Sequence, residues 1–327
     1  MINFNYIQAS GITGALQAMA KDSTAMFIAG GTNLIDLMKR GISAPEKLVD
    51  INNLPLSNIE KNTSGVIRIG AMALNSDVAE HELVQKELPL LAMAINAGAS
   101  PQLRNMATTG GNMMQRTRCS YFYDISMPCN KRNPGSGCSA VNGYNRMHAI
   151  FGASDACIAV HPSDMCVALA ALDAKVFVTG PKKDRTLAFT DFHRLPGNTP
   201  QKDNELERAE LITAIEIPSN NFNKKYHYLK VRDRSSYAFA LVSVAAALEM
   251  NGGNIIHARL AMGGVAHKPW RLREAENYLQ GKSANEETFK QAALLSMKDA
   301  RSYGNNGFKL KMAPQAIISA LNTAANK

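Results

Sequence analysis

The sequence predicts an α+β fold, and three features of the 327-residue chain lead to that prediction. Strand-like and helix-like segments alternate over roughly the first two thirds of the chain. The polar, Asn-rich stretch Pro218–Lys225 then separates this part from the rest. Beyond it, a run of strand-like segments is followed by a run of helix-like ones, an order typical of helices packed on one sheet.

In the first part of the chain, short apolar runs alternate with segments whose apolar residues recur every three to four positions. The apolar run Ala25–Ala29 ends at Gly30–Gly31 and leads into helical spacing over Thr32–Arg40. The other expected strands are Leu48–Ile51, Val66–Ala71, Lys175–Val178 and Leu211–Ile217. The other expected helices are one that begins at Ser76, Glu87–Ala97 and the Ala-rich segment Asp164–Ala174.

The C-terminal part changes from strands to helices along the chain. The expected strands are Tyr226–Val231, Phe239–Leu248 and Ile255–Gly263. The expected helices are Arg271–Gln280, Glu286–Lys298 and Met312–Ala325.

Composition excludes several classes of protein. Hydrophobic residues at 46% and charged residues at 19% are ordinary globular values, so disorder is not expected. The longest apolar runs, such as Ala238–Ala247, are too short to cross a bilayer, and Met1–Ile7 lacks the features of a signal peptide. The net charge of +9 is scattered along the chain, so we expect no nucleic-acid binding.

The five cysteines indicate a metal or redox site. Their odd number argues against a disulfide framework, and their spacing lacks the close CxxC pairs of a zinc ribbon. A four-iron cluster needs four thiolates that converge in space but not in sequence. The candidate ligands are Cys119, Cys129, Cys138 and Cys157.

The surroundings of these cysteines are compatible with a negatively charged cluster, which positive side chains stabilise. The cations in the segment are Arg116, Arg118, Lys131 and Arg132. Cys166 lies in an apolar helical segment, where a lone cysteine usually packs in the core. The spacing alone leaves a zinc site, a redox disulfide and unrelated thiols open.

Two glycine pairs mark a candidate nucleotide site. Gly30–Gly31 follows an expected strand and opens a helix, and Gly110–Gly111 repeats the pattern within Thr108–Asn112. Glycine lets a ligand approach the backbone, and consecutive N–H groups at a helix start attract phosphate. Neither pair matches GxGxxG or a P-loop. The turns indicate either a diphosphate held from two sides by amide hydrogens or two tight turns without a ligand.

These residues resemble those of a known family. Phe27–Leu34, then Leu103–Asn105 leading to Thr109–Asn112, are similar to segments of the flavin subunit in the xanthine dehydrogenase group of molybdenum hydroxylases. The likeness continues through Ser163–Asp164 and Tyr228–Arg232, so it covers nearly the whole chain. It implies a two-subdomain FAD-binding domain of the PCMH/vanillyl-alcohol-oxidase type and a C-terminal α+β domain with an antiparallel sheet and helices on one face. The expected domain bounds are 1–218, with subdomains about 1–55 and 56–218, and 225–327.

The segment between Asn112 and Asp164 differs from that of most relatives and indicates which subgroup of these flavin subunits the chain resembles. Asn112 and Asp164 are separated by the cysteine-bearing segment, about residues 116–158, instead of a short link. A flavin subunit with such an insertion resembles that of bacterial periplasmic aldehyde oxidoreductases, whose loop binds a [4Fe–4S] cluster. The steps Cys119–Asp124 and Pro128–Arg132 fit this pattern. The resemblance therefore implies that the four candidate cysteines bind a [4Fe–4S] cluster.

The resemblance also implies which residues bind FAD. The pyrophosphate and adenosine side would be wrapped, through main-chain N–H groups, by Phe27, Ile28, Ala29, Gly30, Gly31, Thr32, Asn33 and Leu34. The second side would be held by Thr108, Gly111 and Asn112. Asp164 would accept hydrogen bonds from ribityl or ribose hydroxyls, and Lys230 would approach the flavin ring, where a positive charge favours anionic reduced flavin.

The expected function is electron transfer in a molybdenum-dependent aldehyde oxidoreductase complex, with no catalytic residue on this chain. The resemblance implies a heterotrimer in which a molybdenum-cofactor subunit oxidises the aldehyde. A [2Fe–2S] subunit would pass electrons to FAD and on to an external acceptor. The chain would reach the periplasm by co-export with a signal-bearing partner, and would be cytoplasmic without one. The alternatives are the flavin subunit of a benzoyl-CoA-type reductase, a free-standing flavin oxidase, and a non-enzymatic metal or disulfide module.

Overall fold

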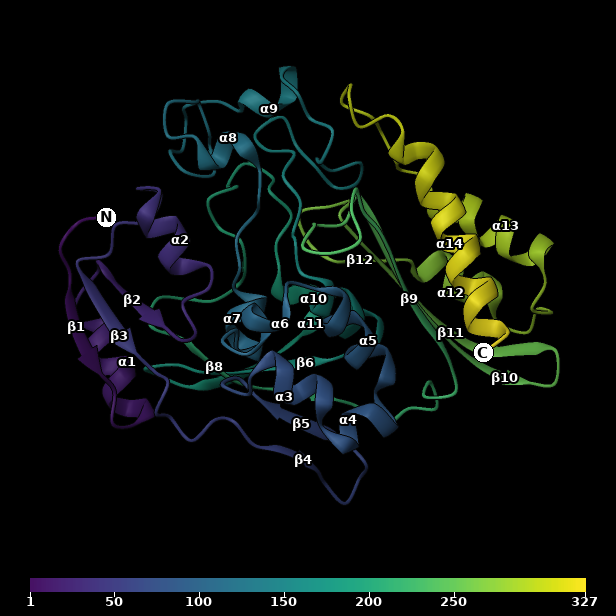
Figure 1. Cartoon of the computed structure of the whole chain (residues 1–327), viewed down its shortest axis with the longest axis horizontal. Helices are drawn as coiled ribbons and strands as arrows, with labels where there is room; N and C mark the ends of the chain where they lie inside the picture. The colour runs from purple at the N-terminus through teal and green to yellow at the C-terminus, as the bar shows by residue number, and fades with distance from the viewer.

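The computed structural model describes all 327 residues and contains three sheets with helices packed around them (Figure 1). The N-terminal sheet is parallel, with the strand order β1-β3-β2. Its elements are β1 (Asn5–Gln8), α1 (Ile12–Ala20), β2 (Ala25–Ile28), α2 (Leu34–Lys39) and β3 (Lys47–Asp50). Because β3 lies between β1 and β2, the turn that follows β2 is at the edge of this sheet.

The second sheet is antiparallel, with the order β4-β5-β8-β6-β7. Its strands are β4 (Ile59–Lys61), β5 (Ile67–Gly70), β6 (Lys175–Thr179), β7 (Asp184–Ala188) and β8 (Leu211–Ile217). The helices between its strands are α3 (Asn75–Glu80), α4 (Glu82–Glu87), α5 (Pro89–Ala97), α6 (Pro101–Arg104), α7 (Thr109–Met113), α10 (Asp164–Ala171) and α11 (Phe189–Phe192). The cysteine-bearing segment adds α8 (Ser120–Tyr123) and α9 (Ser139–Asn142), which lie apart from this sheet in Figure 1.

The third sheet is antiparallel, with the order β12-β11-β10-β9. Its strands are β9 (Lys225–Val231), β10 (Val242–Asn251), β11 (Asn254–Gly263) and β12 (Trp270–Arg271). The helices α12 (Arg273–Leu279), α13 (Glu286–Ser296) and α14 (Lys309–Ala325) lie together on one face of it (Figure 1). The predicted α+β fold is confirmed, and none of the helices is long and apolar enough to span a bilayer.

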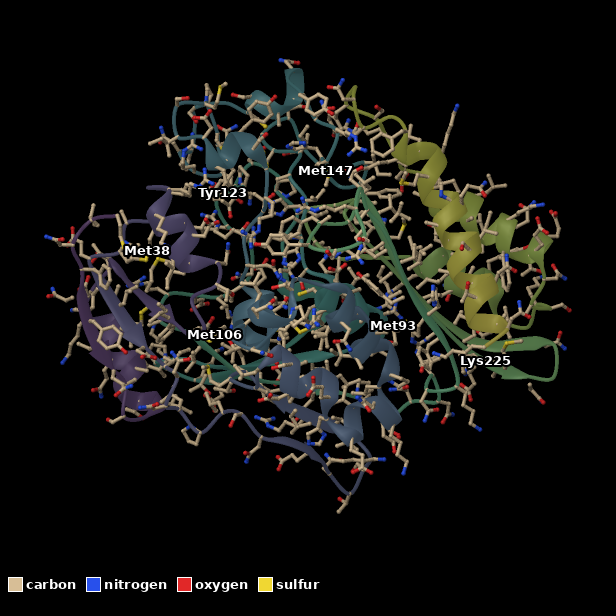
Figure 2. All side chains as sticks on the ribbon, in the orientation of Figure 1. Met38, Met93, Met106, Tyr123, Met147 and Lys225 are labelled. Carbon is tan, nitrogen blue, oxygen red and sulfur yellow. The ribbon has the colours of Figure 1, made fainter.

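The side chains of β10 explain why this strand is apolar at nearly every position. Val244 and Ala246 point into the core beneath α14, whereas Ala245 and Ala247 join the core around α5 and α10. Successive residues of a strand face opposite sides, so β10 is buried on both faces. On the second face, the Tyr228 N–H donates to the Met93 sulfur of α5 at 3.1 Å (Met93 is labelled in Figure 2). The third sheet therefore packs directly against the helices of the second.

Some elements differ from the expectation. The strands β1, β4, β7 and β12 were not expected. The residues of β1 are all exposed, so it carries no apolar alternation. The helix expected from Ser76 is divided at His81 into α3 and α4, and the helix expected over Glu87–Ala97 begins two residues later, at Pro89. Pro89 opens α5 because proline fits the first turn of a helix but not its interior.

Candidate functional site

A cavity of about 1060 Å³ lies where the β2–α2 turn, α7, the start of α10 and β9 meet. This volume is at the upper end of the roughly 300–1,000 Å³ typical of ligand sites, large enough for a dinucleotide-sized molecule. All of the residues predicted to bind FAD line this one cavity: Phe27, Ile28, Ala29, Gly30, Gly31, Thr32, Asn33, Leu34, Thr108, Gly111, Asn112, Asp164 and Lys230. The fold thus brings together segments that are up to two hundred residues apart in the chain.

The two glycine turns are held against each other. A Cβ at Gly30 would lie 1.7 Å from the carbonyl oxygen of Met106, two residues before the second turn begins at Thr108 (Met106 is labelled in Figure 2). No side chain fits at this distance, so glycine is required for the close approach. Gly31 has φ +69°, a left-handed conformation that also favours glycine. The first glycine pair therefore shapes the cavity wall as well as the turn.

Free backbone donors line the first turn. None of the N–H groups of residues 30–34 donates to another group of the protein. The side-chain Nδ2 of Asn33 is also buried without a hydrogen-bond partner. Buried polar groups are rarely left unpaired, and consecutive N–H groups form a concavity that attracts anions. This turn fits the phosphates of a nucleotide cofactor.

The second turn has a different role from the one expected. Its N–H groups already donate within the protein: that of Thr109 to Ala73, that of Gly110 to Ala71, and that of Gly111 to the Thr108 hydroxyl at 3.1 Å. They are satisfied because the turn crosses the end of β5. The second turn therefore supplies shape rather than amide hydrogens, and the expectation of donors from both turns is wrong in this respect.

Asn112 ties the second turn to α10. Its Oδ1 accepts from the Ser163 hydroxyl at 2.5 Å, and its Nδ2 donates to Asn75 at 2.6 Å. Ser163 also caps α10, since its Oγ accepts from the Cys166 N–H at 3.1 Å. The next residue, Asp164, is consequently the first of the helix and faces the cavity.

Asp164 is held by two residues of β9. Its Oδ2 accepts from the Lys230 ammonium and its Oδ1 from the Tyr228 hydroxyl, both at 2.7 Å. Burial, and then the charge of Asp164, raise the pKa of Tyr228 well above its ordinary value, so Tyr228 remains a neutral donor. Lys230 also donates to the carbonyl of Ala97 at 2.9 Å. The anion and the cation expected near the flavin are thus adjacent on the cavity wall.

The four candidate cysteines lie around a second, small cavity: Cys119, Cys129, Cys138 and Cys157 all line it. None is in a disulfide. Burial raises the pKa of Cys119 to about 12 and that of Cys157 to about 11. The nearby Lys131 ammonium acts against this increase at Cys157. Cys166 is elsewhere, fully buried in α10, so it does not belong to this group.

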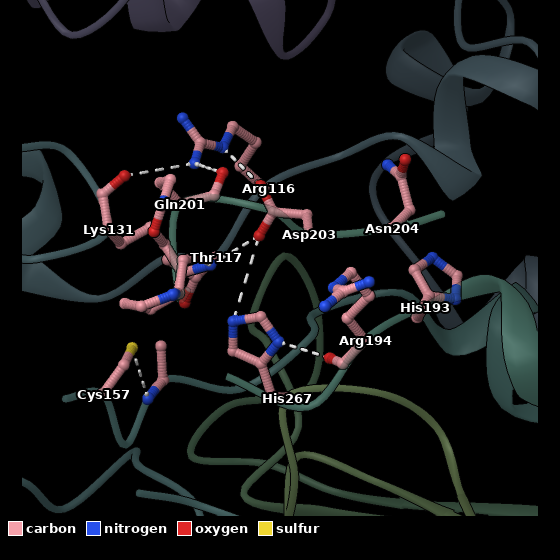
Figure 3. Close-up of polar contacts among 12 residues, drawn as sticks. Arg116, Thr117, Lys131, Cys157, His193, Arg194, Gln201, Asp203, Asn204 and His267 are labelled. Atoms are coloured by element: carbon pink, nitrogen blue, oxygen red, sulfur yellow. Dashed lines mark hydrogen bonds and ion pairs between the residues drawn. The ribbon is translucent and has the colours of Figure 1, made fainter. Parts of the chain in front are cut away.

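Asp203 forms ion pairs with residues of both cavities, and Figure 3 shows these contacts. Its carboxylate accepts from Lys131, on the wall of the cysteine cavity, at 2.5 Å, and from Arg116, on the wall of the large cavity, at 2.7 Å. Burial opposes ionisation, but the charges of Lys131 and Arg116 outweigh it and hold the pKa of Asp203 well below its usual range. The sequence indicated the cations but not Asp203, which lies in a polar stretch without any motif.

Three buried histidines lie near Asp203, and two of them approach Cys166. The Nε2 of His193 contacts the carbonyl of Met113 at 2.9 Å, so it carries the proton. The Nδ1 of His161 accepts the Ser163 N–H, so its other nitrogen, Nε2, is protonated as well and offers no lone pair to a metal. The ring centres of His161 and His193 are 4.3 Å apart. The Nδ1 of His193 is buried without a hydrogen-bond partner, and the group packs in the interior.

Comparison with known proteins gives two family matches. Residues 2–220 match the family described as FAD binding domain in molybdopterin dehydrogenase, and residues 226–323 match the CO dehydrogenase flavoprotein C-terminal domain. Over 302 residues the chain is 49% identical to the aldehyde oxidoreductase FAD-binding subunit PaoB of Escherichia coli (strain K12), covering 92% of this chain and 91% of that one. It is 29% identical over 290 residues to the glyceraldehyde dehydrogenase medium chain of Sulfolobus acidocaldarius, with coverage of 89% and 85%.

Solved structures share this architecture. The carbon monoxide dehydrogenase from Hydrogenophaga pseudoflava aligns with a TM-score of 0.77 at 27% identity, over 99% of this chain and 98% of that one. Quinoline 2-oxidoreductase from Pseudomonas putida 86 gives the same TM-score at 25% identity, with the same coverage.

Proposed function

The chain belongs to the FAD-binding subunits of the molybdopterin dehydrogenase family, and from this premise we propose that it carries FAD and a [4Fe–4S] cluster in an aldehyde oxidoreductase complex. It is an oxidoreductase subunit with an electron-transfer role. The aldehyde substrate is supported by the name of the 49%-identical relative. The observation that carries the proposal is that one large cavity collects every residue expected around FAD, beside a second cavity lined by four free cysteines.

In this proposal the first glycine turn binds the FAD pyrophosphate. The unpaired N–H groups of residues 30–34 and the Asn33 amide would donate to the phosphate oxygens. Thr108, Gly111 and Asn112 would shape the opposite wall, and the Asp164–Lys230 pair would lie beside the ribityl chain and the ring. When bound, FAD exchanges electrons singly or in pairs, which lets it connect one-electron carriers to a two-electron acceptor.

The [4Fe–4S] cluster is supported by the donor set. Four cysteines without disulfides converge on one cavity, as a cubane cluster requires. The Lys131 side chain is only 1% exposed and would place a positive charge beside the net-negative cluster. Because burial raises the pKa of Cys119 and of Cys157, cluster binding would release protons from both thiols.

We further propose that the chain works with two partners. A molybdenum-cofactor subunit would oxidise the aldehyde, and a [2Fe–2S] subunit would deliver the electrons to this chain, in a heterotrimer. Periplasmic location, by co-export with a signal-bearing partner, is part of the same proposal.

Anaerobic purification followed by absorption spectroscopy and iron analysis tests both cofactors. We expect bound FAD and four irons per chain. Cys129→Ala should remove the iron and keep the FAD, whereas Cys166→Ala, the same change at a cysteine outside the cavity, should keep both. FAD without iron in the wild-type protein would favour a flavin oxidase, and zinc in place of iron would refute the cluster. Loss of FAD alone in Cys129→Ala would show that the segment is misassigned.

A further inference from the structure

His148 lies against one of the candidate cluster ligands. Its Nε2 is 3.1 Å from the Cys119 sulfur, and the residue is only 4% exposed. No motif selects this histidine, which is 29 residues from Cys119 in the chain. The contact arises because the chain turns at residues 145–148, where the His148 N–H donates to the Asn145 carbonyl, and because the Ala149 N–H then donates to the carbonyl of Ile158, next to Cys157.

The surroundings of the ring decide which nitrogen carries the proton. The other nitrogen, Nδ1, is buried and has no hydrogen-bond partner. A proton on Nδ1 would leave a buried N–H donor unsatisfied, which costs about 1–3 kcal/mol. A proton on Nε2 instead points at the sulfur of Cys119, which as a thiolate is a charged acceptor. The favoured arrangement is therefore an N–H···S hydrogen bond from His148 to Cys119.

The segment before α14, together with the first residue of that helix, holds His148 in place. The carbonyl of His148 accepts from the Lys309 ammonium at 2.9 Å, and the carbonyl of Ala149 accepts from the Asn306 amide at 2.8 Å. Asn145, at the start of the same turn, donates to the carbonyl of Tyr303 at 2.6 Å. These bonds fix the backbone on which the imidazole is carried.

Lys309 provides a second, independent observation. It is 0% exposed and forms no ion pair with a carboxylate, since its ammonium donates only to the carbonyls of His148 and Gly264. Burial lowers the pKa of Lys309 to about 7, so its ammonium keeps its charge only with a negative partner nearby. A net-negative cluster, one residue away through His148, would supply that negative charge without direct contact.

We propose that His148 sets the reduction potential of the [4Fe–4S] cluster by donating its Nε2–H to the Cys119 sulfur, and that Lys309 and Asn306 position it. This inference rests on the proposed cluster. Reduction adds one electron, so the reduced cluster is the more negative form and gains more from the hydrogen bond and from the buried ammonium. His148 therefore raises the potential and makes the cluster easier to reduce.

The test is a redox titration of the purified, cofactor-loaded complex with dithionite, followed by the EPR signal of the reduced cluster. His148→Phe replaces the imidazole by another aromatic ring, which has no N–H donor. We expect it to retain four irons and to lower the equilibrium constant for reduction about tenfold, a shift of ~59 mV to more negative potential for one electron. His148→Gln, which restores a side-chain N–H, should recover most of the shift. His257→Phe, at an exposed histidine, should leave the potential unchanged.

Lys309→Met is a second variant that leaves the imidazole intact. It should shift the reduction potential in the same direction, because the variant loses the positive charge and also the hydrogen bond from Lys309 to the His148 carbonyl. A wild-type potential in an iron-replete His148→Phe protein would overturn the inference. Loss of iron from that variant would overturn it too, since it would make His148 a ligand or an assembly residue. If the wild-type protein contains no iron, the proposed function itself is refuted. The iron content of the wild-type protein is therefore measured before any variant is tested.

Discussion

The Lys230 ammonium donates to the Asp164 carboxylate at 2.7 Å, and their side chains are only 5% and 7% exposed. Lys230 is on β9 of the third sheet, whereas Asp164 opens α10, which lies between β5 and β6 of the second sheet in the chain. Both line the large cavity. The pair therefore fastens the two halves of the chain at the wall where FAD is proposed to bind.

Lys230→Met should weaken both the fold and the cofactor site. The change leaves the Asp164 carboxylate buried without its cation, which typically costs about 3–5 kcal/mol. We expect the free energy of unfolding in urea to fall by about 3 kcal/mol and FAD affinity, measured by fluorescence titration, to fall at least tenfold. Lys224→Met, at an exposed lysine of the neighbouring loop, should change neither. The double variant Asp164→Asn/Lys230→Met should regain stability, and equal losses in the single and double variants would contradict the pairing.

Gly30→Ala should disrupt the contact between the two glycine turns. The new Cβ would lie 1.7 Å from the Met106 carbonyl oxygen, so the turns must separate. Strain of this kind costs about 1–3 kcal/mol, and we expect FAD content after purification to fall several-fold. Gly14→Ala is the matched control, because its Cβ meets nothing within 4 Å and lies in α1. Alanine should stabilise that helix by about 1 kcal/mol. Unchanged FAD content in Gly30→Ala would contradict the proposed binding of the FAD pyrophosphate by the first glycine turn.

Short local patterns explain what could be predicted from the sequence. Gly30–Gly31 and the alternation in β8 carry their structural meaning within a few residues, so the turn and the strand were expected at nearly the observed positions. The pair Lys131–Asp203 spans 72 residues and the contact of His148 with Cys119 spans 29, so both depend on how the chain folds back. β1 was missed for a related reason: its stability comes from pairing with β3, not from an apolar pattern of its own.

Asp203→Asn should destabilise the junction between the two cavities. Lys131 is buried, and Asp203 is its only carboxylate partner, so the variant leaves the ammonium with neutral acceptors only, such as the Pro200 carbonyl. We expect the free energy of unfolding to fall by about 3 kcal/mol. Asp184→Asn, at an exposed position of β7, should have no effect larger than about 0.5 kcal/mol. A neutral result for Asp203→Asn in the same urea titration would show that the buried charge is compensated elsewhere.

Stability should fall between pH 6.5 and 4 because of the buried histidines. Burial lowers the pKa of His193 and of His267 from 6.5 to about 4, so both stay neutral in the folded chain while the unfolded chain takes up protons. Protons bound mainly by the unfolded state reduce stability as the pH falls, by ~1.4 kcal/mol per pH unit for each histidine. This loss ends near pH 4, where the folded state is protonated too.

Urea unfolding of the FAD-loaded protein at several pH values tests this dependence. His267→Gln keeps a donor for the Arg194 carbonyl, which the Nδ1 of His267 contacts at 2.8 Å, but removes the titrating ring. Between pH 6.5 and 4, the free energy of unfolding of this variant should change less steeply with pH than that of the wild-type protein, by up to ~1.4 kcal/mol per pH unit. His257→Gln, at an exposed site, should keep the wild-type slope. The pKa of Asp203 is lowered instead, so its contribution to the free energy of unfolding is lost only below pH 3.8. If the free energy of unfolding falls only in that lower pH range, the acid sensitivity comes from the carboxylates and not from the histidines.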